Sequence, residues 1–193
     1  MVSEEFENLL VKVAEYQRTH FFGKYRGTVK TVGEEENLGY ITAVVHEVFG
    51  EDFETDWAAP AAAFAGDKHG LVALPEVDDG VWIEFEAGDA SRPIWSGFWW
   101  ADGEMPEPKG PLIRTFITSK GHKLILDDEN NEVKLLHADG AELTMTDSDV
   151  TIKIGQSTVK LSDSEISLEN GTSGSIKISS SGVDLGNGAV KTS

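Results

Sequence analysis

The last third of the chain, from about His122 to Leu185, alternates apolar and polar residues with a period of two. A typical segment, Val150–Ile154, places three aliphatic residues on one side, with Thr and Lys between them. This alternation is typical of strands that bury one face only. Such segments recur every seven to ten residues and are separated by small polar turns, which indicates a repeat architecture. Eight segments follow the pattern: 123–126, 132–135, 142–145, 150–154, 158–161, 165–168, 175–178 and 182–185.

The repeat contains no aromatic residue, since all seventeen Phe, Tyr and Trp residues lie at or before Phe116. A stripe of Val, Ile and Leu can line a narrow seam, but it cannot fill the interior of a globular domain. A meander of such short strands exposes its apolar face unless something covers it. Further copies of the same chain would provide that cover. We therefore expect residues 117–193 to form an intertwined trimeric β-helix, or β-prism. A single-chain solenoid or a half-open sheet is the alternative.

The expected core of this trimer is the apolar stripe of the repeat, turned inward. Its members are the alternate apolar residues of five successive segments. They are Leu143, Met145, Ile152, Ile154, Val159, Leu161, Ile166, Leu168, Ile176 and Ile178.

The N-terminal region, residues 1–21, is predicted to contain one amphipathic helix over residues 3–18. Ser3 is a suitable N-cap, and two glutamates follow it in the first turn. Helical spacing brings together an apolar stripe of Phe6, Leu9, Leu10 and Val13. So short a helix is marginal in water by itself. We expect it to pack on its own barrel, on sister chains or on a larger partner.

Residues 22–101 are predicted to form a small closed barrel. Strand patterns cover 25–32, 38–48, 71–74, 80–86 and 93–98, and the long loop 50–70 is expected to cross the barrel. About five strands rich in aromatic residues and glycine indicate an OB-fold barrel. Three prolines and two glycines within 102–111 cannot continue a central strand, so we place a linker at 102–116. The fold class is therefore all-β, with an N-terminal helix.

The stretch from Leu74 to Gly97 reads Leu-Pro-Glu-Val-Asp-Asp-Gly-Val-Trp-Ile-Glu-Phe-Glu-Ala-Gly-Asp-Ala-Ser-Arg-Pro-Ile-Trp-Ser-Gly. It resembles the barrel of the central spike family of contractile injection machines. That family includes phage baseplate assembly protein V, the tail spike of contractile phages and the VgrG spike of type VI secretion. The segments Thr55–Ala58 and Phe64–Gly66 resemble it too, although Tyr40 stands where an arginine is common.

The resemblance implies a structural, membrane-puncturing spike at the tip of a contractile tail or injection-system baseplate. Such a spike is a homotrimer that sits under a hub protein, and here Phe6, Leu9, Leu10 and Val13 would face the hub. No large hub domain precedes the barrel, so we expect another protein to supply it. The resemblance also implies a location at the baseplate of a phage or phage-like particle, assembled in the cytoplasm and released in some systems.

The far end of the needle is expected to carry a separate tip protein and to meet the target cell membrane on contraction. Some short spikes end in a His-x-His pair that holds an iron ion, and no such pair occurs in this sequence. We therefore expect no metal or other cofactor. The resemblance implies instead that a PAAR-type tip protein docks on Val183, Leu185, Asn187 and Val190.

Composition limits the other function classes. The net charge is −18, of which about −13 lies at or before Phe116, so neither part offers a basic surface for nucleic acid. No cysteine, nucleophile elbow, phosphate loop or zinc-type histidine spacing occurs, and no catalytic residue is expected. No signal peptide or membrane-spanning run is recognisable.

Two alternative functions remain open. One is an OB-fold binding module for single-stranded nucleic acid or glycan, with a β-solenoid tail, that stacks its ligand on Trp95, Trp99 and Trp100. The other is an envelope-degrading enzyme, which lytic activity on cell-wall preparations would reveal and for which we expect none.

Overall fold

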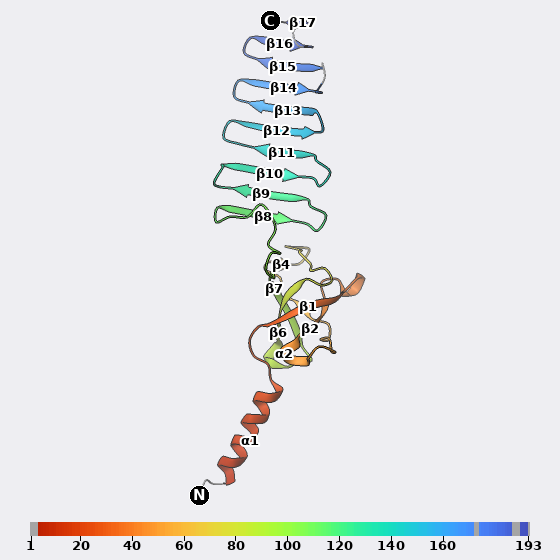
Figure 1. The fold of residues 1–193 in the computed structure, drawn as a ribbon, viewed down its shortest axis with the longest axis vertical. Coiled ribbons are helices and arrows are strands. Elements are labelled where there is room, and N and C mark those ends of the chain that lie inside the picture. The colour runs from red at the N-terminus through yellow and green to blue at the C-terminus, as the bar shows by residue number, and fades with distance from the viewer. Residues whose placement is uncertain (1–3, 172–173, 187–189, 193) are drawn as a thin grey trace. The chain divides into compact units, whose positions relative to one another are not determined.

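The computed structural model describes residues 4–171, 174–186 and 190–192 of the 193-residue chain. The chain divides into two compact units, Met1–Glu104 and Met105–Ser193. The first unit contains the long helix and a curled five-stranded sheet, and the second contains one long antiparallel sheet (Figure 1). The predicted all-β fold class, with an N-terminal helix followed by a barrel and a β-repeat, is confirmed.

Helix α1 spans Glu4–Thr19, close to the predicted 3–18, while the expected N-cap Ser3 lies outside the described residues. Glutamates in the first turn and Arg18 in the last turn complement the helix dipole. The Thr19 hydroxyl closes the final turn by donating to the Glu15 carbonyl oxygen at 2.9 Å. No side chain of α1 is buried.

The barrel is built on a sheet with strand order β2-β1-β6-β7-β3. Strand β6 shows why the sequence folds this way: Val81, Ile83 and Phe85 alternate inward, while Trp82 and Glu84 face the other side. The strand bounds are Tyr25–Val32 for β1, Ile41–Val44 for β2, Ala59–Pro60 for β3, Gly80–Phe85 for β6 and Pro93–Phe98 for β7.

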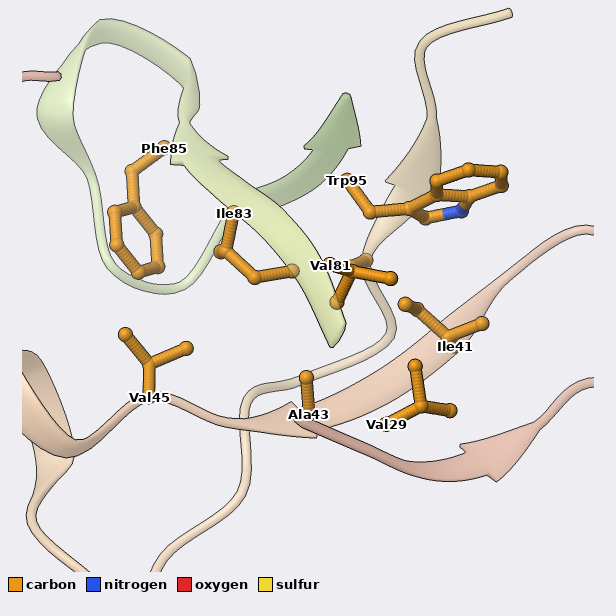
Figure 2. Packing of buried hydrophobic residues seen from close by; sticks show 9 residues of the cluster. Val29, Ile41, Ala43, Val45, Val81, Ile83, Phe85 and Trp95 are labelled. Atoms are coloured by element: carbon orange, nitrogen blue, oxygen red, sulfur yellow. The ribbon is translucent and has the colours of Figure 1, made fainter. Parts of the chain in front are cut away.

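The core of the barrel is a single cluster of buried apolar side chains. Figure 2 shows Val81 and Ile83 of β6 on the side of the cluster opposite Ala43 of β2. The cluster contains Val29, Ile41, Ala43, Val45, Ala58, Val81, Ile83, Phe85 and Trp95.

Two predicted barrel strands differ in the structure. The segment 38–48 is a strand only over β2, and the short helix α2, His46–Phe49, follows it. No strand forms over 71–74, where Leu71 and Val72 are exposed. The backbone N–H of Leu71 donates to the Phe64 carbonyl oxygen at 2.9 Å, and Leu74 packs against the barrel core. The loop 50–70 does carry structure, namely β3 and the hairpin of β4, Ala65–Gly66, with β5, His69–Gly70.

Short 3₁₀ turns complete the first unit. They are η1, Glu35–Asn37, and η2, Glu86–Gly88. The second turn contains Gly88 in the left-handed region, with φ of 81°, and its backbone approaches the ring of Phe22. A Cβ at this glycine would lie 2.9 Å from that ring, so the close approach requires glycine.

The second unit is a ten-stranded sheet in which β8 to β17 follow one another in chain order. All neighbouring strands are antiparallel. The strands are β8 Ile113–Ile117, β9 Lys123–Asp127, β10 Glu132–Leu136, β11 Glu142–Met145, β12 Asp149–Ile154, β13 Ser157–Ser162, β14 Glu165–Glu169, β15 Ser175–Ser179, β16 Gly182–Leu185 and β17 Val190–Thr192.

Strands β9 to β16 coincide with the eight predicted segments, and β8 occupies the end of the predicted linker. The turns follow ordinary turn chemistry: the Asp127 carboxylate accepts hydrogen bonds from the backbone N–H groups of Glu129 and Asn130, both at 3.0 Å. Because each inner strand pairs on both sides with its sequence neighbours, their backbone ladder is formed within one chain.

Candidate functional site

The register of the long sheet separates its side chains into two faces of opposite character. Leu161 lies opposite Ile166, and Ile166 lies opposite Ile178, so cross-strand partners stack aliphatic on aliphatic. We call this side the aliphatic face. It consists of Leu124, Leu126, Val133, Leu135, Leu143, Met145, Val150, Ile152, Ile154, Val159, Leu161, Ile166, Leu168, Ile176, Ile178, Val183 and Leu185.

All ten residues expected in the trimer core lie on the aliphatic face. None of its members is buried in the single chain, and Ile154 is the most exposed, at 65%. Between β12 and β15 the face is hollowed into an open groove of about 500 Å³, lined by Ile152, Ile154, Val159 and Ile176. Contiguous apolar surface on this scale marks an interaction site in soluble proteins.

The opposite side of the sheet, which we call the polar face, is organised by ion pairs. Lys160 lies 2.9 Å from the carboxylate of Asp149, and Lys177 lies 3.4 Å from Glu169 and 4.0 Å from Glu165. The hydrogen bond from Lys160, assisted by its charge and by nearby threonine hydroxyls, lowers the pKa of Asp149. This face is suited to water, whereas the aliphatic face is not.

The first strands of the sheet depart from this division. Ile125 points to the side of the polar face and is the one aliphatic side chain of the second unit that is buried, among the residues that the structure describes. Its cross-strand neighbours are Thr115 and Lys134, while Ile117 and Leu136 lie on the same side nearby. Sequence reasoning missed this small cluster, although the uninterrupted run Leu124–Leu126 was a signal that both sides are apolar there.

Sequence reasoning also left the first strands out of the expected core. Leu124, Leu126, Val133 and Leu135 continue the aliphatic face toward β8, where Phe116 lies opposite Leu124. Their alternation was visible in the sequence.

The residues expected to meet other proteins lie at both ends of the chain. Phe6, Leu9, Leu10 and Val13 on α1 are all exposed. Of the expected tip-docking residues, Val183 and Leu185 lie on the aliphatic face of β16. Asn187 lies outside the described residues, and of Val190 only the backbone, at the start of β17, is described.

The tryptophans expected to stack a ligand do not form a common platform. Trp95 is 5% exposed, and its indole N–H donates to the Gly39 carbonyl oxygen at 2.8 Å in the barrel core. The indole of Trp99 donates to a backbone carbonyl, and the guanidinium of Arg26 lies over its ring, 5.0 Å from the centroid. Trp100 is exposed. The barrel therefore uses two of the three for its own packing.

The polar side chains around Glu84 on the barrel form hydrogen bonds with one another. Glu84 accepts hydrogen bonds from Lys24 and from the Ser96 hydroxyl, and these lower the pKa of its carboxyl group. In the part of the chain that the structure describes, no group of three or more His, Asp or Glu side chains could hold a metal ion. His122 and His137 approach each other with ring centroids 4.4 Å apart, but without a third ligand.

No described helix is long and apolar enough to cross a membrane.

Two protein-family models match the chain. Residues 25–100 match the type VI secretion system/phage-baseplate injector OB domain. Residues 114–172 match the phage baseplate V C-terminal trimerisation domain. The first match covers the barrel, and the second covers β8 to β14 and with them most of the aliphatic face. No protein in the curated collection of characterised sequences matches the chain.

Proposed function

We propose that this chain, which belongs to the phage baseplate V family of spike proteins, is the membrane-puncturing spike of a contractile tail or injection-system baseplate. The family places the protein in a baseplate as a structural component. The proposal goes further and assigns it the mechanical role of a homotrimeric needle.

The observation that carries this proposal is the aliphatic face. The backbone ladder of the inner strands is satisfied within one chain, so the exposed aliphatic side chains are what remains to be covered. The match of residues 114–172 to a trimerisation domain supports two further copies as the cover. Turning three aliphatic faces inward and three polar faces outward buries the apolar surface and leaves the ion pairs in water.

This arrangement suits the transmission of axial force. A needle whose chains share one aliphatic core loses apolar burial along its whole length if a chain separates. The barrier to separation is therefore high, and the stability of the assembly becomes kinetic. Strands stacked through continuous hydrogen-bond ladders also resist shortening along the stack.

Two partners belong to the same proposal. A baseplate hub would hold the N-terminal helix and the barrel, where Leu9, Leu10 and Val13 are exposed on α1. A PAAR-type tip protein would dock at the C-terminal end of the repeat, where Val183 and Leu185 continue the aliphatic face. We propose no enzymatic activity for the chain, and its alternative role as a nucleic-acid or glycan module lacks the tryptophan platform.

A complementation experiment tests the proposed role. In cells that produce the contractile particle and lack their own copy of this chain, the wild-type chain is expected to restore particles that penetrate target cells. The Ile166→Asp variant, which places a charge on the aliphatic face, is expected not to restore them. Particles that assemble and penetrate normally without the chain would rule the role out.

A further inference from the structure

Helix α1 carries a heptad pattern that the spike role of the second unit does not use. Phe6, Leu9, Val13 and Tyr16 follow one another at spacings of three, four and three residues, and His20 continues the series after four more. Alternating steps of three and four place these side chains along one line of the helix, as in the a and d positions of a coiled coil. We call Phe6, Leu9, Val13 and Tyr16 the heptad seam.

The heptad seam is exposed in the single chain. Leu9 and Val13 keep 56% and 45% of their surface accessible, and the helix has no buried side chain at all. A helix of 16 residues is marginal in water without tertiary packing. Glu4, Glu7, Glu15 and Arg18 occupy the sides of the helix away from the seam, and Glu5 and Lys12 flank it. We therefore expect a partner to cover the heptad seam.

The seam continues without interruption to the edge of the barrel. The ring of Tyr16 stacks on His20 with centroids 3.9 Å apart, and Phe22 follows 6.1 Å from Tyr16. The backbone N–H of Phe21 donates to the Gly88 carbonyl oxygen at 2.8 Å, which attaches the end of the helix to the barrel. Beside the seam lies an open groove of about 540 Å³, lined by Val13, Tyr16, Gln17 and Tyr25 among others. An adjacent helix could use both the seam and this groove.

We propose that the occupant of the heptad seam is the same helix of the two sister chains, so that three copies of α1 form a parallel coiled coil. The inference rests on the proposed homotrimer. A closed trimer relates its chains by a threefold axis, so equivalent helices that meet along that axis run in the same direction. Since the needle already joins the three chains, their helices meet at an effective concentration in the millimolar range rather than at the free concentration. The coiled coil would thus add to the trimer that we propose for the second unit.

The coiled coil changes how the hub would be recognised. Phe6, Leu9 and Val13 turn toward the sister helices, whereas Leu10 flanks the seam and Val11 lies on the other side of the helix. The hub would therefore contact the outside of a three-helix stalk, at Val11 and the surrounding polar residues. It would not receive three separate amphipathic helices.

The absence of native cysteine allows a direct test by disulfide trapping in the full-length chain. Val13→Cys places a thiol in the seam, and Val11→Cys is the matched control, a valine two residues away on the opposite side. Disulfides form only when the Cα atoms approach to about 4.4–6.8 Å. Under mild oxidation, Val13→Cys is expected to form a covalent dimer at least tenfold faster than Val11→Cys. Because three thiols can form one disulfide, at most two of every three chains become linked. Leu9→Cys repeats the test at a second seam position and is expected to behave like Val13→Cys.

Light scattering on the same reduced samples separates this inference from the proposed function. If the chain is trimeric and neither Val13→Cys nor Leu9→Cys links faster than Val11→Cys, the coiled coil is wrong and the spike stands. If the chain is monomeric, the proposed trimer is wrong, and the coiled coil, which needs the trimer, is wrong too. A trimer with rapid linkage at either seam position and slow linkage at Val11→Cys supports both.

Discussion

Ile166 of β14 lies directly opposite Ile178 of β15, and the two side chains keep 39% and 43% of their surface exposed. Paired aliphatic side chains of this kind normally stabilise a sheet by excluding water from each other and from the layer above. Within the described residues, no further layer covers them. The pair is one step of the aliphatic face, and its exposure in a single chain is the reason for proposing that other copies cover it.

Replacing Ile166 with Asp is therefore expected to abolish the trimer. In the assembled needle the substitution would place three carboxylates in an apolar interior, where an ion without a partner costs on the order of several kcal/mol. Size-exclusion chromatography with light scattering should show the loss of the trimer.

The matched control for Ile166→Asp is Thr151→Asp on the polar face. Thr151 lies opposite Lys160, so the added carboxylate faces solvent and a lysine. This variant should remain trimeric. Loss of the trimer in both variants, or in neither, would mean that the two faces have been assigned incorrectly.

Acid should weaken the second unit in part through Asp149. Its folded-state pKa is lowered by the hydrogen bond from Lys160, so the ion pair contributes stability at pH values above the ordinary aspartate pKa of about 3.9. That contribution is lost as the pH falls through the lowered folded-state pKa. The melting temperature of the wild type should therefore exceed that of Asp149→Asn at pH 7, and the difference should shrink as the pH falls below about 4.

A second variant isolates the cause of this pH dependence. Lys160→Met removes the ammonium group that lies 2.9 Å from Asp149. In the Lys160→Met background, the Asp149→Asn substitution should change the melting temperature little at any pH. If Asp149→Asn lowers the melting temperature as much in the Lys160→Met background as in the wild type, a neighbour other than Lys160 lowers the pKa of Asp149.

The barrel should respond to substitutions in its own core. Ile83 is completely buried, and Ile83→Ala is expected to destabilise the barrel by about 2–5 kcal/mol. All five tryptophans lie between Trp57 and Trp100, so their fluorescence reports the unfolding of the first unit. Val77→Ala, at an exposed position, should change the barrel's stability by less than about 0.5 kcal/mol. Equal effects of the two substitutions would contradict the assigned core.

The barrel should not bind single-stranded nucleic acid. Trp95 is buried and Trp99 is covered by Arg26, while the charge at or before Phe116 is about −13. Titration with a fluorescent oligothymidylate at physiological salt should show no saturable binding. A dissociation constant tighter than about 10⁻⁴ M, the weak end of non-specific binding, would restore the binding-module alternative.

Local periodicity was sufficient to predict most of the second unit. The segments 142–145 and 182–185 coincide with β11 and β16 because strict alternation and short polar turns leave one register in which all aliphatic residues share a face. The same alternation accounts for the inward position of Val81, Ile83 and Phe85 on β6.

The sequence failed where local pattern and tertiary context disagree. Leu71 and Val72 have the composition of a strand, but whether a strand forms depends on an available sheet edge, which the sequence does not reveal. The alternative use of Trp95 as a stacking residue failed for a similar reason. Only the fold shows that its indole N–H reaches the Gly39 carbonyl oxygen, 56 residues away in the chain.

The molar mass of the full-length chain in solution tests the central claim most directly. Light scattering at micromolar concentration should give the mass of three 21.0 kDa chains, about 63 kDa, and the oligomer should survive unheated detergent. A folded particle of 21 kDa under the same conditions would show that one chain tolerates its exposed aliphatic face in water, and would contradict the trimeric needle.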